Sequence, residues 1–402
     1  MGPMSDPLLA YRERFPILQT TTYLINNSLG AMPGDVAERM RAYAGIWAQR
    51  GVRAWAEEWW PMPVAVGDLV APILGVAPGT VSMHTNVTLA SAVFFSCLEP
   101  KGRRTRVVTT ELQFPSIQYL MDQWCRGRGA ELVIVPSGPA GLGSDPQRLL
   151  DAIDDRTLAV SISHVEFKSA FINDGAAVAR RCRETGALLL LDVFQSAGVV
   201  PIEAAAWGVD ACVGGCLKWL CGGPGNVFLY VDPDLSKRLE PRLTGWMAHP
   251  APFAFEPLPM RRREGAWRFL NGTPQIACLY AAGPGLRMHA EIGVPAIREK
   301  SRAMTTYLHD SARERGWTPH CPADPDRRGG TVAVDVPEGE RVAKELLARD
   351  VVIDYRPGAG IRIAPHFYNT LDECRFALDQ IAEILETKAY EKHGSVAGAS
   401  PT

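Results

Sequence analysis

The stretch Val209–Val231, VDACVGGCLKWLCGGPGNVFLYV, places a single basic residue, Lys218, in a run of apolar and small residues. A Gly-Gly-Pro-Gly turn, Gly222–Gly225, follows, and a strand-like run ends the stretch. Burial disfavours the charged ammonium form, so a lysine held among such residues has a lowered pKa. A lysine of this kind can form a covalent bond with a carbonyl compound. The alternative interpretation is a lysine at a strand end whose ammonium group extends to water.

A second polar residue upstream favours the chemical interpretation. The run ALLLLDV, Ala187–Val193, fits a strand that is buried on both faces of a parallel sheet, and Asp192 lies at its carboxyl end. Ligands in such folds bind at the carboxyl ends of the strands, so we expect Asp192 and Lys218 to meet there. This pair suits pyridoxal phosphate, because the lysine forms the imine and the aspartate pairs with the pyridinium nitrogen.

The composition limits the class of protein. A chain of 402 residues exceeds the usual size of a single core, so we expect two domains. A net charge of −2 gives no reason to expect binding to nucleic acid or to a membrane. The nine cysteines form no Cys-x-x-Cys pair and no His/Cys pair has zinc-ligand spacing, so no metal site is expected. Without a signal-peptide pattern, these cysteines predict reduced thiols in the cytoplasm.

Strands and helices alternate over roughly residues 85–230, which predicts an α/β fold with a mostly parallel sheet. Thr370 and Glu373 form a capping box before the last predicted helix. The expected strands are a short strand that begins at Tyr23 and breaks into a polar turn by Gly30, and the segments 106–109, 131–135, 158–163, 187–193, 226–231, 331–336, 351–355 and 361–364. The expected helices are 33–50, 89–97, 146–153, 174–185, a helical region over 275–315, 341–349 and 371–386, with 232–275 irregular.

A phosphate site is predicted where one of these helices begins. Thr85 or Asn86 can cap the helix, which leaves its first backbone N–H groups beside the Thr88 hydroxyl. The alternative is a capped helix without a ligand. Phe114, further along, either stacks on a planar cofactor or belongs to the core.

Taken together, these motifs resemble the class V aminotransferase family, fold type I of the pyridoxal-phosphate enzymes, and within it the kynureninases. The resemblance extends from Asn26 to about Ala389. The segments that carry it are Asn27–Gly30, Asn86–Thr88, Phe114–Ser116, Asp192–Gln195, Trp207–Asp210, Lys218, Gly245–Trp246 with His249, Ile361–Pro365 and Tyr368–Asn369.

The resemblance implies a domain organisation. Residues 37–280 would form a large cofactor-binding domain with the mostly parallel sheet, and residues 281–391 a smaller C-terminal α+β domain. Residues 1–36 would join the small domain, and residues 392–402 would form a disordered tail. The family also implies a homodimer with shared active sites and a small amino-acid substrate.

The resemblance also implies roles for single residues. Lys218 would carry the cofactor and move the Cα proton, and Asp192 would keep the ring nitrogen protonated. Gln195 stands where kynureninases have His, near the phenolic oxygen of the ring. The other implied cofactor-binding residues are Val87, Thr88, Phe114, Ser163, Trp246 and Thr273, of which Trp246 and Thr273 match positions that reach the phosphate of the other subunit. The implied substrate-binding residues are Asn27 and Arg362, whose guanidinium would hold the substrate α-carboxylate.

Three positions depart from the kynureninase pattern. Leu217 replaces the Tyr before the lysine, and Ile117 replaces an acid. The residues Gly51–Trp55 stand where kynureninases carry the His that recognises the kynurenine ring. The implied activity is cleavage of the Cβ–Cγ bond of kynurenine or a related amino acid, giving alanine and an acyl product. The alternatives are an aminotransferase, an epimerase or a Cβ–S lyase acting on another amino acid.

A nucleotide-binding module is a further alternative from a different class. It is disfavoured because Leu217-Lys218-Trp219 does not match the phosphate-binding loop pattern.

Overall fold

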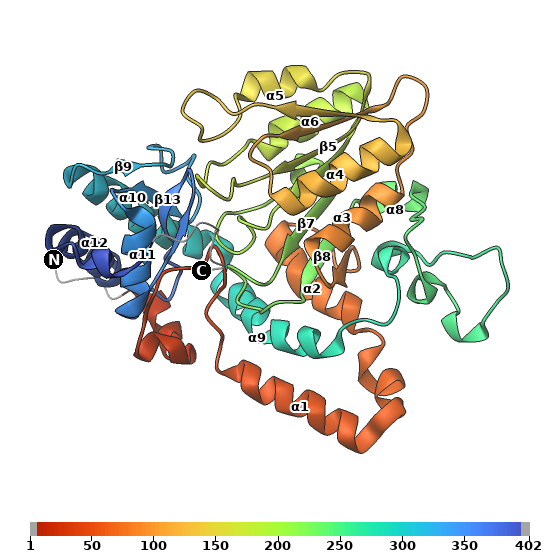
Figure 1. The fold of residues 1–402 in the computed structure, drawn as a ribbon. Helices are drawn as coiled ribbons and strands as arrows, with labels where there is room; N and C mark the ends of the chain where they lie inside the picture. The colour runs from red at the N-terminus through yellow and green to blue at the C-terminus, as the bar shows by residue number, and fades with distance from the viewer. Residues whose placement is uncertain (1–5, 395–402) are drawn as a thin grey trace.

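The computed structural model describes residues 6–394. A seven-stranded sheet forms the centre of the larger part of the molecule (Figure 1). In spatial order its strands are β2 (Val81–His84), β8 (Val227–Val231), β7 (Ala211–Gly215), β6 (Leu188–Asp192), β5 (Thr157–Ser163), β3 (Arg106–Thr110) and β4 (Glu131–Val135).

The strands from β7 to β4 pair in parallel, and β8 is antiparallel to both of its neighbours. The predicted mostly parallel α/β sheet is therefore confirmed. Strand β8 runs antiparallel because a loop without a crossover helix joins it to β7. A parallel neighbour would require a longer crossover connection. Lys218 lies in that loop.

Both faces of the sheet are buried. Along β6, Leu189 and Leu191 belong to one apolar cluster and Leu190 belongs to another. This alternation places the two clusters on opposite faces of the strand, as expected for a central parallel strand. The helices of this part are α1 (Asp35–Arg50), α2 (Met62–Leu74), α3 (Val87–Ser96), α4 (Pro115–Arg128), α5 (Pro146–Ala152), α6 (Gly175–Thr185), α7 (Ala204–Trp207), α8 (Pro233–Arg238) and α9 (Ile276–Ile292).

Four of these helices, α2, α4, α7 and α8, were not predicted from the sequence. Most residues of α2 are buried, because the helix lies between β2 and α9, and it therefore has no polar face that would give a helical period. The segment predicted to be irregular, 232–275, contains α8 and short 3₁₀ helices at Trp246–Ala248, Pro252–Ala254 and Gly265–Phe269. None of the helices within residues 6–394 is both long and apolar enough to cross a membrane.

A second, four-stranded sheet lies beside the first (Figure 1). All of its strand pairs are antiparallel, in the order β12-β13-β10-β9. Its strands are β9 (Thr318–Pro319), β10 (Val332–Asp335), β12 (Asp354–Arg356) and β13 (Gly360–Ile363), with helices α10 (Val294–Glu314), α11 (Gly339–Ala348) and α12 (Leu371–Thr387). The predicted capping box of α12 is confirmed, since Thr370 and Glu373 bond to each other's backbone N–H groups.

The N-terminal segment contacts this second part of the chain. β1 (Thr22–Tyr23) pairs in parallel with β11 (Val351–Val352). The domain boundaries at 36/37 and 280/281 stay a prediction. Of the predicted disordered tail, residues 395–402 lie outside the described residues, while Lys392 and His393 contact Glu345 of α11.

The close packing of α2 on β2 depends on Gly67. A Cβ atom at this position would lie 2.1 Å from the carbonyl oxygen of Val81, so Gly67→Ala requires the helix to move away from the strand. We expect this change to lower the free energy of unfolding by about 1–3 kcal/mol. Gly45→Ala in α1 is the matched control, because a Cβ there meets no atom within 4 Å. The control should stabilise the protein by about 0.5–1 kcal/mol in denaturant unfolding, and equal effects at the two positions would contradict the argument.

Candidate active site

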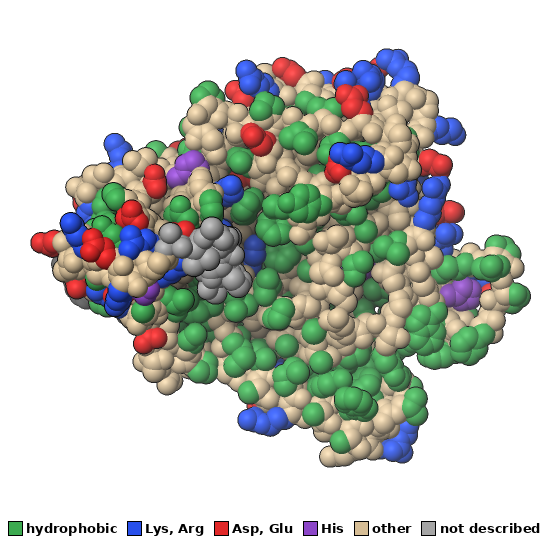
Figure 2. Space-filling view, viewed as in Figure 1, with side chains coloured by type: hydrophobic (Ala, Val, Ile, Leu, Met, Phe, Trp, Pro, Cys, Tyr) green, Lys and Arg blue, Asp and Glu red, His purple; other side chains and the backbone are tan. Residues whose placement is uncertain are grey.

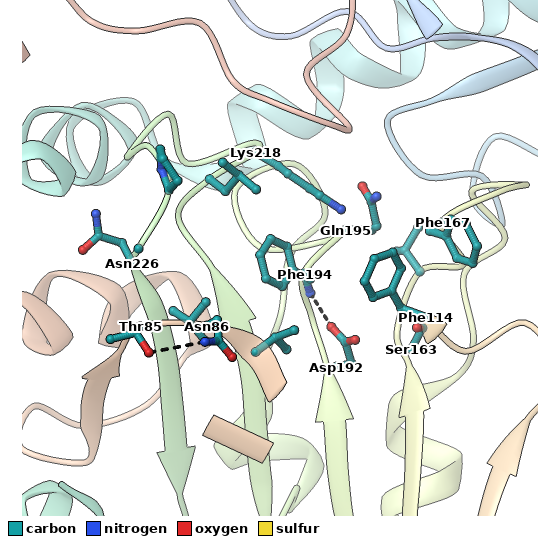
Figure 3. A pocket seen from close by; sticks show the side chains of 16 residues that line it. Thr85, Asn86, Phe114, Ser163, Phe167, Asp192, Phe194, Gln195, Lys218 and Asn226 are labelled. Atoms are coloured by element: carbon teal, nitrogen blue, oxygen red, sulfur yellow. Dashed lines mark hydrogen bonds between the residues drawn. The ribbon is translucent and has the colours of Figure 1, made fainter. Parts of the chain in front are cut away.

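A cavity of about 310 Å³ lies at the carboxyl ends of β5, β6 and β7 (Figure 3). This is the edge of a parallel sheet at which ligands bind in such folds. Its lining residues are Thr85, Asn86, Val87, Phe114, Ser163, Val165, Phe167, Asp192, Phe194, Gln195, Leu217, Lys218, Pro224, Gly225, Asn226 and Val227. Asp192 and Lys218 therefore share one cavity, as the sequence predicted.

Asp192 is the last residue of β6 and is buried. One carboxylate oxygen accepts a hydrogen bond of 2.9 Å from the backbone N–H of Phe194. Burial raises the pKa of Asp192 to about 6, although that hydrogen bond and Lys218 both favour the ionised form. A positively charged partner at the second oxygen would therefore stabilise this carboxylate.

Lys218 lies three residues beyond β7, and its ammonium group points into the cavity (Figure 3). Burial, together with the nearby Arg362, lowers the pKa of Lys218 to about 8. Its Nζ atom lies 4.8 Å from the ring centroid of Phe194 and 5.7 Å from that of Phe114. Within residues 6–394 this nitrogen has no hydrogen bond and no ion pair, so it is free to act as a nucleophile.

Phe194 was not predicted as a site residue, and no sequence signal marks it. Its ring occupies space that Gly215, at the end of β7, leaves open. A Cβ at Gly215 would lie 2.3 Å from this ring. Gly215 is thus required for the aromatic wall beside Lys218.

The start of α3 forms another wall. Asn86 caps the helix, since its side chain accepts a hydrogen bond of 2.9 Å from the N–H of Leu89. Asn86 and Val87 line the cavity, whereas Thr88, in the first turn, does not. The N–H groups of a first helical turn have no partner within the helix, and together with the helix dipole they favour a bound anion.

Two further predicted residues, Phe114 and Ser163, line the cavity and are linked through Gln113. The side-chain oxygen of Gln113 accepts hydrogen bonds from the Ser163 hydroxyl and from the backbone N–H of Phe114. The ring of Phe114 contacts the ring of Phe167 edge to face at 5.5 Å. The start of α4 and the end of β5 are thereby fixed to one another. Phe167 itself was not predicted.

Arg362 does not line the cavity, but it is hydrogen-bonded to Phe167, which does. It is buried on β13, and its Nε donates a hydrogen bond of 2.8 Å to Asp354, which a second guanidinium nitrogen also contacts. Its Nη1 donates a hydrogen bond of 2.7 Å to the carbonyl of Phe167. Asp354 also forms an ion pair with Arg356, with a nitrogen–oxygen distance of 3.0 Å. Sequence reasoning missed Asp354, although its position opposite Arg362 in the β12–β13 register follows from the strand pairing.

The remaining predicted site residues lie outside the cavity lining. Asn27 is buried, and neither polar atom of its side-chain amide has a hydrogen-bond partner among the described residues. Thr273 is exposed. Trp246 is 38% exposed and packs against Trp60 and Phe253. The assigned roles of all these residues stay predictions.

The family model for aminotransferase class V matches residues 23–369. The chain belongs to this family. It is 31% identical to a protein named kynureninase from Burkholderia pseudomallei strain K96243, over 96% of this chain and 94% of the relative. It is 30% identical to a kynureninase from Pseudomonas fluorescens, with the same shares covered.

Solved structures have the same fold. The apo cysteine desulfurase from Thermococcus onnurineus NA1 superposes with a TM-score of 0.82 at 20% identity, covering 96% of this chain and 100% of that one. The cystine C-S lyase C-DES, in complex with cysteine persulfide, superposes with the same score and identity, covering 92% of this chain and 99% of that one. The expected fold type I architecture is confirmed.

Family membership makes pyridoxal phosphate the cofactor of this protein. The cavity fits the group. It contains a lysine amine that has no hydrogen bond or ion pair among the described residues, a buried carboxylate that would pair with the ring nitrogen, and the first turn of α3, which would receive the phosphate. Phe114 and Phe194 form apolar walls of this cavity. Within residues 6–394 there is no cluster of three His, Cys, Asp or Glu side chains that could hold a metal ion.

A buried acid that was not predicted, Glu166, stands in the chain between Val165 and Phe167, which both line the cavity. It is 1% exposed, and one of its oxygens accepts a hydrogen bond of 2.8 Å from Asn173. Burial, reinforced by the nearby Asp192, raises the pKa of Glu166 from about 4.5 to about 8. Between these pH values the native protein binds more protons than the unfolded chain, so its stability falls as the pH rises.

We therefore expect Glu166→Gln to weaken this pH dependence. The amide stays neutral, so the free energy of unfolding of the variant relative to the parent should rise from pH 5 to pH 9 by a few kcal/mol, on the order set by the pKa shift. Urea unfolding at pH 5, 7 and 9 measures this difference. Glu314→Gln is the control, because Glu314 is exposed on α10. Parallel pH profiles for the parent and Glu166→Gln would contradict the assignment.

Proposed function

We propose that this enzyme is a pyridoxal-phosphate-dependent hydrolase of the kynureninase type. It would cleave the Cβ–Cγ bond of kynurenine or a related amino acid to give alanine and an acyl product. The observation that carries the proposal is the shared cavity of Lys218 and Asp192, in a chain that is about 31% identical to kynureninases along nearly its whole length.

The residues of the cavity have distinct tasks in this proposal. When bound, pyridoxal phosphate supplies an electron sink for the negative charge that develops on the substrate Cα. Asp192 keeps a proton on the ring nitrogen, which maintains that sink. Lys218 Nζ removes the Cα proton and can return it, because a pKa near 8 allows both protonation states near neutral pH.

Arg362 is the proposed group for the substrate α-carboxylate. Asp354 and the carbonyl of Phe167 already engage three of its N–H groups, and the other two, which have no partner within residues 6–394, are left for a ligand. The planar guanidinium is held in one orientation by these bonds, which suits the bidentate geometry of a carboxylate. Asn27 is the second proposed substrate contact, since its buried amide has no other partner among the described residues.

The other cofactor contacts follow from position. The first turn of α3, with Val87 and Thr88, would hold the phosphate, and Phe114 would stack on the ring. Ser163 and Gln195 would complete the polar edge of the cavity. We propose that Trp246 and Thr273 contact the cofactor phosphate of a second subunit in a homodimer, because both residues are exposed to solvent in the single chain. A cytoplasmic location stays part of this proposal.

One departure affects the choice of reaction. Leu217 lines the cavity at the position where kynureninases have Tyr, so no hydroxyl group stands there to donate a hydrogen bond. An aminotransferase, an epimerase or a Cβ–S lyase acting on another amino acid is the alternative. A cysteine desulfurase is disfavoured, because the residues between β12 and β13, Pro357–Ala359, contain no cysteine.

We expect the purified protein with pyridoxal phosphate to absorb in the visible range and to release alanine from kynurenine. Lys218→Ala should lose both the visible band and the activity, since the amine that holds the cofactor is gone. Absorption spectra and product analysis measure these two effects. Glutamate-dependent formation of a keto acid without alanine release would instead support an aminotransferase.

Arg362→Lys should raise KM for kynurenine by about tenfold or more, because lysine cannot make the bidentate contact. The visible absorption of the bound cofactor should be unchanged. Arg375→Lys on the exposed face of α12 is the control and should leave KM unchanged. An unaltered KM in Arg362→Lys would exclude this arginine as the carboxylate site.

A further inference from the structure

The side-chain amide of Gln195 has two hydrogen-bond partners, one that can only donate a hydrogen bond and one that can only accept one. The indole Nε1 of Trp219 donates to one end of the amide at 3.1 Å. The other end donates to the backbone carbonyl of Asn27 at 3.0 Å. An indole N–H can only donate and a carbonyl can only accept, so the amide cannot be reversed without losing both bonds.

This constraint determines what Gln195 presents to the cavity that it lines. Its oxygen is engaged by Trp219 and one of its hydrogens by Asn27, which leaves the second N–H hydrogen of the amide. Among the described residues no partner takes this hydrogen, so the amide nitrogen has one N–H left to donate to a ligand. Unlike a histidine ring, an amide keeps this hydrogen at every pH at which the protein is folded.

The position of Gln195 relates this donor to one edge of the cofactor. In pyridoxal phosphate the aldehyde carbon lies between the phenolic oxygen and the phosphate arm, and the ring nitrogen lies opposite. Figure 3 shows Asn86, at the start of α3, to the left of Asp192, whereas Gln195 lies above Asp192 and close to the end of the Lys218 side chain. With the phosphate at α3, the edge that carries the phenolic oxygen faces Gln195.

We propose that Trp219 is a positioning residue that fixes the Gln195 amide with its N–H, and not its oxygen, toward the phenolic oxygen of the cofactor. The inference rests on the placement of the cofactor in the proposed function, and it adds a residue that follows Lys218 directly in the sequence. The donor stabilises negative charge on the phenolic oxygen at all working pH values.

Trp219 itself is held in place from several sides. It is 1% exposed, and a Cβ at Gly330 would lie 2.7 Å from its ring, so this glycine provides the space for the indole. The Nε2 of His366 lies 2.7 Å from the backbone carbonyl of Trp219, which requires this nitrogen to carry the hydrogen. The orientation of Gln195 thus depends on Gly330 and His366, which flank strands β10 and β13 of the four-stranded sheet and contact Trp219.

The experiment measures the pH midpoint of the visible absorption band in the full-length enzyme loaded with pyridoxal phosphate. With the cofactor bound, the proton that titrates would lie between Lys218 Nζ and the phenolic oxygen. A hydrogen-bond donor to that oxygen stabilises its negative charge and therefore lowers the pKa of this proton. Trp219→Phe frees the amide to turn, so we expect the midpoint to rise by about one pH unit.

A double-mutant cycle separates positioning from packing. If Trp219 acts through Gln195, then Trp219→Phe should cause no further shift in a Gln195→Leu background. Trp124→Phe is the matched control, because the buried indole of Trp124 also donates a hydrogen bond, to Phe95, away from the cavity. It should leave the midpoint unchanged. An unchanged midpoint in Trp219→Phe, or a shift that adds to that of Gln195→Leu, overturns the proposal.

Gln195→Glu tests the same point without altering the tryptophan. A carboxylate oxygen would replace the N–H that faces the phenolic oxygen, so the midpoint should rise further than in Trp219→Phe. An unchanged midpoint would mean that Gln195 presents no N–H to the phenolic oxygen and would overturn the proposal even if Trp219→Phe did not fold. An enzyme that shows these shifts but releases no alanine from kynurenine would overturn the proposed function and leave this inference intact.

Discussion

The structure depends on holding an amine and a carboxylate together away from water. Lys218 and Asp192 have opposite charges and share one cavity, yet burial moves the pKa of each toward its neutral form. Their mutual attraction does not offset the loss of hydration. A cofactor with an aldehyde for the amine and a basic ring nitrogen for the carboxylate gives both groups a partner. The adjacency of β6 and β7 is what brings the two residues to one edge of the sheet.

The loop that carries the lysine connects the separate parts of the chain. The backbone N–H of Gly30, from the N-terminal segment, donates a hydrogen bond of 3.0 Å to the carbonyl of Leu217. A Cβ at Gly30 would lie 2.1 Å from the carbonyl oxygen of Lys218, so only glycine permits this approach. On the other side, the His366 ring donates a hydrogen bond to the backbone carbonyl of Trp219.

The exposed aromatic side chains over the segment 246–258 lie on the opposite side of the molecule from the four-stranded sheet (Figure 2).

Sequence reasoning succeeded where local chemistry decides the structure. The cap at Asn86, the capping box at Thr370 and the buried strand that ends at Asp192 all follow from short-range patterns, and the structure contains each of them. It failed at α2, whose residues are buried on most sides and show no helical period. It also missed Phe194 and Asp354, because their roles arise from strand pairing and side-chain packing, which a local sequence pattern does not show.

The sequence by itself determined which groups could perform the chemistry, since a lysine in an apolar run and an aspartate at a strand end acquire perturbed pKa values when the fold buries them. Only the tertiary structure decided how those groups are oriented. Arg362 is held by an aspartate on the neighbouring strand, and Gln195 is held by an indole and a distant carbonyl. Orientation depends on which partners the packed chain brings within hydrogen-bond distance, and a linear pattern of residues does not contain that information.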